Sequence, residues 1–154
     1  MQPDETILKA GFQKYLKTME NLNAATVADL SRVMSDDVHF VDPFNDVIGL
    51  TKVQTIFQHM YKKLKDPRFI IRHAALDLNG HDPAGLIRWR MDGKLKSNDR
   101  PWPIEGMSEV RFTKDGRVRE HVDHWDSGVQ FFERLPVIGG IIRLIKTGMK
   151  SVNH

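Results

Sequence analysis

The sequence predicts an α+β fold in which a curved, mostly antiparallel sheet wraps around three helices from the first half of the chain. Two observations predict this class. Apolar residues recur at spacings of three and four up to about residue 64, as in amphipathic helices. Runs rich in β-branched and aromatic residues follow, separated by Asn-Gly and Asp-Gly pairs. The chain of 154 residues is expected to form a single domain.

Three helices are expected before the sheet. A capping-box pattern, Thr26 to Asp29, opens a short second helix that continues through Met34. A second capping box, Thr51 to Gln54, opens a third helix that continues to Leu64. The first helix lies within residues 4–22, where one apolar stripe contains Leu8, Phe12, Tyr15, Leu16, Met19 and Leu22.

Four strands in meander order are expected in the second half. The pairs Asn79-Gly80, Asp92-Gly93 and Asp115-Gly116 separate them, and such pairs are strong hairpin signals. The segment 94–103 (KLKSNDRPWP) is long for a hairpin, so it is expected to be a mobile rim or a surface loop. The strands are expected within residues 68–80, 84–93, 103–116 and 117–126.

Charge and composition exclude several classes of function. The net charge of +3 equals the charge of residues 141–154, which contain Arg143, Lys146 and Lys150 and no acid. The body is therefore neutral, and no nucleic-acid partner is expected. The chain has no cysteine, and its first residues lack both a basic segment and a continuous apolar run, so no signal peptide is expected. We expect a cytoplasmic protein.

The last part of the chain, about residues 128–154, is expected to be an amphipathic extension. Pro136 and the Gly139-Gly140 pair are expected to break the chain before an apolar segment with Arg143 and Lys146. The apolar side chains could pack on the body, form a dimer contact or lie on an anionic membrane. Packing or dimerisation is expected ahead of membrane contact, because three cations give only weak adhesion.

The stretch VHFVDPFNDVIG, residues 38–49, contains an acid among apolar residues. Strand alternation puts Val38, Phe40 and Asp42 on one face. Burying a carboxylate on that face costs on the order of several kcal/mol of folding free energy unless the group is paired or protonated. From the residues alone, Asp42 is either the first residue of an Asp-Pro turn or a group used in chemistry.

The last predicted strand carries a second candidate site. His121, Asp123 and Trp125 alternate and so project from one face. The run HVDH does not predict a metal site, because His124 points away from His121 and no third ligand is near in the sequence. Either an acid/base pair or a structural polar network fits His121 and Asp123.

Four motifs resemble the nuclear transport factor 2-like superfamily, and in particular its SnoaL-like and ketosteroid isomerase-like cone domains. They are QKYLKTMENL, DDVHFVDPF, VRFTKDGRV and REHVDHWD. The resemblance covers about residues 5–127 in element order. It implies a cystatin-like cone with an internal pocket, followed by the extension.

The resemblance also implies a site for a small, mostly apolar molecule of polyketide or steroid type, with no cofactor or metal. Asp42 would be the general base, Tyr15 the oxyanion donor, and His121 with Asp123 an acid/base pair. Ser108 occupies the position where the isomerases carry their second oxyanion donor. The residues expected to contact ligand are Trp89, Trp102, Ser108, Val110, Phe112 and Trp125.

Two functions follow from the resemblance. One is a cofactor-free isomerase, cyclase, dehydratase or hydrolase. The other is a non-catalytic ligand-binding or dimeric assembly module of the same fold, because fold does not determine function. A homodimer paired through the sheet is expected in both cases.

Overall fold

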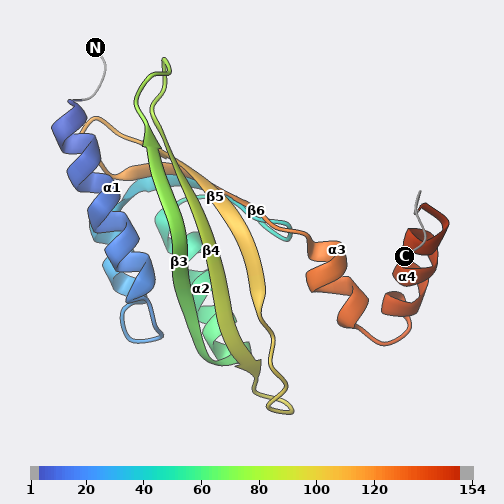
Figure 1. The fold of residues 1–154 in the computed structure, drawn as a ribbon. Helices are drawn as coiled ribbons and strands as arrows, with labels where there is room; N and C mark the ends of the chain where they lie inside the picture. Colours follow the sequence, from blue (N-terminus) through green and yellow to red (C-terminus); the bar gives the residue numbers. More distant parts are fainter. Residues whose placement is uncertain (1–3, 150–154) are drawn as a thin grey trace. The chain divides into compact units, whose positions relative to one another are not determined.

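The computed structural model describes residues 4–149 and divides into two compact units, Met1–His124 and Trp125–His154. The first unit contains a six-stranded sheet and the helices that pack on it, and the described part of the second unit consists of short helices (Figure 1). The boundary lies close to the expected end of the cone at residue 127. Among the described residues, no helix has the length and hydropathy needed to span a membrane.

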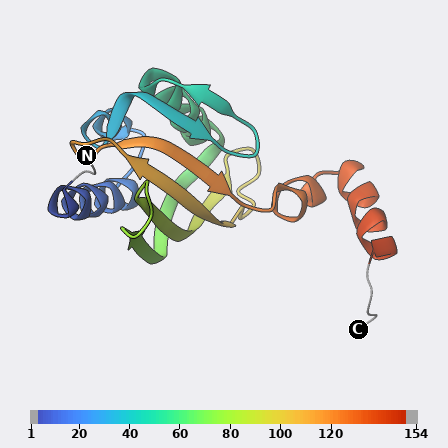
Figure 2. The same cartoon turned by 90° about the horizontal axis from the view of Figure 1, so that it is seen from above.

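The sheet of the first unit has the strand order β2-β1-β6-β5-β4-β3. The β1 and β6 strands are parallel, and all other neighbours are antiparallel. Figure 2 shows the strands curving as they cross the unit. The strands are β1 (Met34–Val41), β2 (Asp46–Ile48), β3 (Leu64–Asp77), β4 (Ala84–Leu95), β5 (Ile104–Phe112) and β6 (Val118–His124). This confirms the predicted α+β class.

Two α-helices and one 3-10 helix precede or interrupt the sheet: α1 (Glu5–Glu20), η1 (Val27–Arg32) and α2 (Leu50–Lys63). Asp4 caps α1, because its side chain accepts a hydrogen bond from the Thr6 amide at 2.7 Å. The apolar stripe of α1 is buried as predicted, with Leu8, Phe12 and Tyr15 at most 3% exposed. Gly11 lets α1 approach the turn after β5 closely, since a Cβ there would lie 2.1 Å from the Gly116 carbonyl oxygen.

Neither predicted capping box forms. Thr26 is the N-cap of the second element, as expected, but its side chain makes no capping hydrogen bond. The second element is a 3-10 helix that ends at Arg32, and Met34 already belongs to β1. The α2 helix begins after Gly49, which has a φ of 115° and whose amide donates to the Val38 carbonyl at 2.9 Å. Glycine adopts this left-handed backbone without steric cost, so the chain turns from β2 into α2 before Thr51.

One predicted turn is also wrong. Asp92-Gly93 lies inside β4, where Asp92 pairs with Arg68 of β3. The long β3–β4 ladder carries the chain past this pair, and the connection to β5 begins after Leu95. Trp102 in that connection is only 6% exposed, and its amide donates to the Gly93 carbonyl at 2.8 Å. The other two pairs, Asn79-Gly80 and Asp115-Gly116, do lie between strands.

The second unit contains α3 (Ser127–Gln130), η2 (Phe132–Arg134) and α4 (Ile138–Met149). The Gly139-Gly140 pair lies within α4, so the expected break occurs earlier, at Pro136 and Val137. Gly139 is required there, because a Cβ would lie 2.2 Å from the Glu133 carbonyl oxygen. Lys150, counted in the basic extension, lies outside the described residues.

Candidate active site

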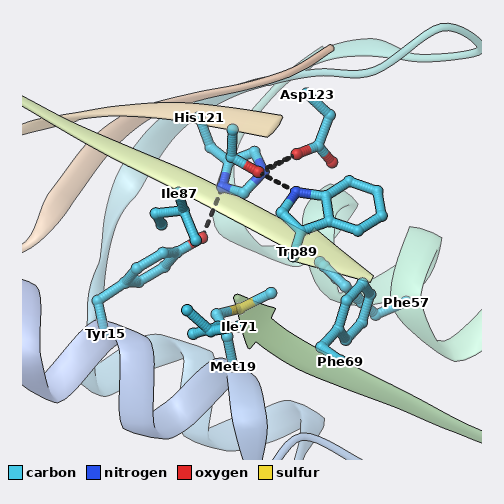
Figure 3. Close-up of a pocket in the computed structure, with 10 residues that line it drawn as sticks. Tyr15, Met19, Phe57, Phe69, Ile71, Ile87, Trp89, His121 and Asp123 are labelled. Atoms are coloured by element: carbon cyan, nitrogen blue, oxygen red, sulfur yellow. Dashed lines mark hydrogen bonds and ion pairs between the residues drawn. The ribbon is translucent and has the colours of Figure 1, made fainter. Parts of the chain in front are cut away.

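A small cavity lies between the sheet and the helices of the first unit, with a volume of about 30 Å³ (Figure 3). One part of its wall is hydrocarbon from α1, α2, β3 and β4: Met19, Phe57, Phe69, Ile71 and Ile87. A buried water needs about 10–15 Å³. The cavity therefore has room for about two or three waters, and side chains must move to admit a larger molecule.

The other part of the wall is polar. It consists of Tyr15 from α1, Trp89 from β4, Ser108 from β5, and His121 and Asp123 from β6. Ser108 and Asp123 are direct cross-strand partners. Tyr15, Trp89, Ser108 and His121 are each at most 8% exposed, so these polar groups are largely removed from water.

These five side chains form one continuous chain of hydrogen bonds. The Tyr15 hydroxyl lies 2.5 Å from His121 Nδ1, and His121 Nε2 lies 2.7 Å from Asp123 Oδ1. Ser108 donates to the same Asp123 oxygen, and Trp89 Nε1 donates to Ser108 Oγ at 2.7 Å. A buried polar network is stabilising when all its groups are satisfied, which is nearly the case here.

With a neutral imidazole and an ionised Asp123, each bond in this chain has one direction. Ser108 receives the Trp89 N–H, so its own hydrogen is donated to Asp123. With Asp123 ionised, neutral His121 donates from Nε2, which leaves Nδ1 as an acceptor for the Tyr15 hydroxyl hydrogen. His121 is thus held in one tautomer by its two partners.

Asp123 is bonded through one of its two carboxylate oxygens. Both of its hydrogen bonds reach Oδ1, and within residues 4–149 no side chain or amide bonds Oδ2. The side chain is 16% exposed and lines the cavity. Figure 3 shows the second oxygen turned away from the imidazole. The carboxylate is therefore oriented on one side and available as an acceptor on the other.

Burial raises the pKa of Tyr15 well above 10, and the negative charge of Asp123 raises it further. Tyr15 is therefore a neutral hydrogen-bond donor at neutral pH and not a tyrosinate. The His121 ring also stacks on Phe40 of β1, with ring centroids 4.9 Å apart. This contact fixes the plane of the imidazole.

The structure does not bring Asp42 to the cavity. β1 ends at Val41, so the alternation that would place Asp42 beside Phe40 stops one residue too early. Asp42 Oδ1 accepts hydrogen bonds from the Phe44 and Asn45 amides, both at 2.7 Å, and from the Asn45 side chain. This is the turn-forming arrangement that the residues alone also allowed.

Four other expected contact residues lie elsewhere. Val110 and Phe112 are buried but do not line the cavity, and Phe112 packs edge-on against Phe12. Trp102 is buried in the β4–β5 connection. Trp125 follows the end of β6 and belongs to the second unit, so the expected strand face does not extend to it.

The remaining sequence candidates do come together at the cavity: Tyr15, Trp89, Ser108, His121 and Asp123. The Ser108 hydroxyl donates its hydrogen to Asp123, so Ser108 orients the carboxylate. The apolar wall was not predicted from the sequence. Two sequence features could have indicated this wall. They are Phe57 on the apolar face of α2, and Phe69 with Ile71 at alternate positions of β3.

Within residues 4–149, no three His, Cys, Asp or Glu side chains gather in a way that could hold a metal ion. In particular, His124 is exposed at the end of β6, whereas His121 is 3% exposed and is bonded on both nitrogens to protein groups.

Comparisons with solved structures show the same architecture in distant proteins. A protein from Jannaschia sp. CCS1, proposed to be a SnoaL-like polyketide cyclase, is 10% identical with a TM-score of 0.67, and the match covers 82% of this chain and 92% of that one. An LEH-like epoxide hydrolase from M. tuberculosis is 16% identical with a TM-score of 0.61, covering 94% and 99%.

A third structure, an NTF2-like protein of unknown function from Exiguobacterium sp. 255-15, is 16% identical with a TM-score of 0.64, covering 75% of this chain and 98% of that one. No significant match was found among proteins of curated function. The model of the SnoaL-like domain family matches residues 15–121. This chain therefore belongs to the SnoaL-like domain family, and its fold is similar to that of the NTF2-like protein from Exiguobacterium.

Proposed function

We propose that this SnoaL-like protein is a cofactor-free enzyme that moves a proton on a small, mostly apolar molecule, with Asp123 as the general base. The observation that supports this most strongly is the asymmetry of the Asp123 carboxylate. Oδ1 is held by Ser108 and His121, whereas Oδ2 makes no hydrogen bond with the described residues. A fixed carboxylate beside hydrocarbon is suited to accept a proton from carbon or from water.

His121 and Tyr15 supply the electrophilic side of the reaction in this proposal. In the resting state Tyr15 donates to Nδ1 of neutral His121. When a substrate oxygen enters the cavity, the hydroxyl hydrogen of Tyr15 turns from Nδ1 towards that oxygen, and His121 neither gains nor loses a proton in this step. Tyr15 then donates to a substrate oxygen on which negative charge develops. The apolar wall excludes water, which strengthens that hydrogen bond.

The names of the structural neighbours suggest which reactions to test. They include a proposed polyketide cyclase, a proposed isomerase of the SnoaL-like family and an epoxide hydrolase. Proton abstraction from carbon and activation of water both need one oriented carboxylate and one hydroxyl donor. Asp123 and Tyr15 provide both groups, so the proposal extends to either chemistry.

The test is a turnover panel with a β,γ-unsaturated ketone, an alkyl epoxide and an aromatic polyketide ester, for the wild type and Asp123→Asn. Asparagine keeps the shape and the Oδ1 acceptor but cannot take the proton. Turnover by the wild type that falls about 10²-fold or more in the variant supports the proposal, since general bases contribute that much. Equal turnover by both proteins would overturn it.

A non-catalytic ligand-binding or dimeric assembly module is the second candidate. The cavity of about 30 Å³ favours it, because sites for drug-sized ligands usually measure several hundred Å³. If the panel shows no turnover but NMR shifts at Trp89 and Tyr15 report saturable binding, the module is the better description. Sedimentation equilibrium tests the proposed homodimer independently of ligand.

A further inference from the structure

The cavity has to enlarge before a substrate can enter it. Its volume of about 30 Å³ holds about two or three waters, whereas sites for drug-sized ligands usually measure several hundred Å³. At least one side chain of the wall therefore leaves its resting position when a ligand binds. The side chain that moves most easily sets the size of the molecule that the site accepts.

Most of the wall is held in place. The polar side chains are fixed by their continuous chain of hydrogen bonds. The aromatic side chains contact one another edge-on, with ring centroids 6.2 Å apart for Phe57 and Phe69 and 5.8 Å apart for Phe69 and Trp89. Ile71 and Ile87 are β-branched residues in strands, so rotation about χ1 is restricted. Moving any of these groups breaks a hydrogen bond or a ring contact, or strains a side chain.

Met19 is the exception in this wall. It lies in the last turn of α1, which ends at Glu20, and its side chain is 8% exposed and lines the cavity. Figure 3 shows this side chain extending from α1 between Tyr15 and Phe69. A thioether side chain is unbranched and has three rotatable bonds, so it changes shape at little cost. Met19 is therefore the lining residue that can make room with the least disturbance of its neighbours.

We propose that Met19 moves aside when a ligand binds and thereby limits the substrate to a molecule with a single apolar ring. Withdrawal of Met19 adds the space of the atoms beyond its Cβ (Cγ, Sδ and Cε) to a cavity that holds about two or three waters. About five or six ligand atoms then fit, which is the size of one ring.

The chemical class of the substrate follows from the polar wall. An oxygen on the ring accepts the hydroxyl hydrogen of Tyr15, so the structure favours a monocyclic ketone or epoxide and excludes a polyketide with several rings. This inference rests on the proposed function, because both place the ligand in the same cavity. The test below measures binding and not turnover. If Asp123 is not the base, the result for Met19 still stands, and if Met19 does not move, the turnover panel still tests Asp123.

The test is NMR titration of the full chain with two ketones, cyclohexanone and the bicyclic 2-decalone. The indole N–H signal of Trp89 reports occupation of the cavity, because this group lies in its wall and donates to Ser108. In the wild type, cyclohexanone should shift this signal and the methyl signal of Met19 with the same Kd. Met19→Ala should bind 2-decalone about tenfold more tightly than the wild type, since even one methylene in an apolar pocket has an effect of about that size.

Met34→Ala is the matched control. Met34 on β1 is fully buried and does not line the cavity, so the substitution deletes the same atoms from another part of the core. It should leave the affinity for 2-decalone, read at the Trp89 signal, unchanged. Equal affinities of Met19→Ala and the wild type would overturn the proposal. An equal gain in Met34→Ala would also overturn it, because the gain would then come from general loosening of the core.

Two further measurements do not depend on a variant that enlarges the core. Met19→Leu keeps the number of side-chain heavy atoms, and such exchanges are well tolerated in cores. Leucine is branched and has fewer rotatable bonds, so this variant should bind cyclohexanone several-fold more weakly than the wild type, and equal binding would contradict the proposal. In the wild type, a cyclohexanone titration that leaves either the Trp89 signal or the Met19 methyl signal unshifted would show that Met19 does not open the cavity.

Discussion

The Tyr15 hydroxyl on α1 lies 2.5 Å from Nδ1 of His121 on β6, although the two residues are 106 positions apart in the sequence. Both side chains are at most 3% exposed. This bond ties the first helix to the last strand of the sheet at the edge of the cavity. It also sets the tautomer of the imidazole and thereby the hydrogen bond that reaches Asp123.

Tyr15→Phe should destabilise the fold. The substitution leaves His121 Nδ1 buried without a donor, which costs about 1–3 kcal/mol in the free energy of unfolding. Tyr61→Phe is the matched control, because among the described residues the buried Tyr61 hydroxyl has no hydrogen-bond partner. Its removal should be neutral or stabilising. Urea unfolding of both variants measures the difference, and equal losses would show that the Tyr15–His121 bond contributes nothing.

Both tyrosines should titrate late in alkali. Burial raises the pKa of Tyr61 to about 12, and burial together with the negative charge of Asp123 raises the pKa of Tyr15 well above its ordinary value of 10. Absorbance at the tyrosinate band should therefore stay flat through the ordinary range. A tyrosinate signal with the full amplitude of two residues near pH 10 in the folded protein would contradict this burial.

The same pKa shifts predict a loss of stability at high pH. Above the unfolded pKa of about 10, the unfolded chain loses its tyrosine protons while the folded chain keeps them, so the free energy of unfolding falls as pH rises. Tyr15→Phe removes one of the two titrating groups. Its stability should decline less steeply above that pH than the stability of the wild type, in urea unfolding repeated across the alkaline range.

Ser108 is expected to act as a positioning residue for Asp123. Ser108→Ala removes the acceptor of the Trp89 N–H and one of the two donors to Asp123, so we expect a loss of about 1–3 kcal/mol in stability. In the proposed enzyme it should also lower kcat more than it raises KM, and Ser108→Thr, which restores the hydroxyl, should recover both.

Ser35→Ala is the control for that variant. Ser35 is 4% exposed, and its hydroxyl has no hydrogen-bond partner among the described residues. Its loss should be neutral or stabilising. If Ser108→Ala and Ser35→Ala behave alike in both unfolding and turnover, Ser108 does not orient Asp123.

The sequence was sufficient to predict the α+β class and the order of its elements, because helical and strand periodicities are local properties of the chain. It misplaced the start of α2, since Gly49 ends β2 and caps the helix with a backbone conformation that no pattern in Thr51–Gln54 indicates. The turn predicted at Asp92-Gly93 does not form, because the pairing of β4 along the whole of β3 overrides this local turn signal.

The candidate site was predictable where it depends on strand alternation. His121 and Asp123 share a face of β6, and both line the cavity with Tyr15. The prediction from strand alternation was wrong for Asp42, which lies just after β1, and for Trp125, which lies just after β6. The ends of strands are the positions that sequence patterns locate least well. The bond between Ser108 and Asp123 depends on the register of β5 against β6, a tertiary property that the residues alone do not specify. The catalytic roles themselves stay predictions.

The most direct test of the central claim compares Asp123→Asn with Asp42→Asn on a substrate that the panel identifies. Both variants replace a carboxylate by its isosteric amide, one at the cavity and one in the turn between β1 and β2. We predict that kcat/KM falls about 10²-fold or more for Asp123→Asn and stays close to wild type for Asp42→Asn. The reverse result, with turnover lost at position 42 and kept at position 123, would contradict the assignment of Asp123 as the base.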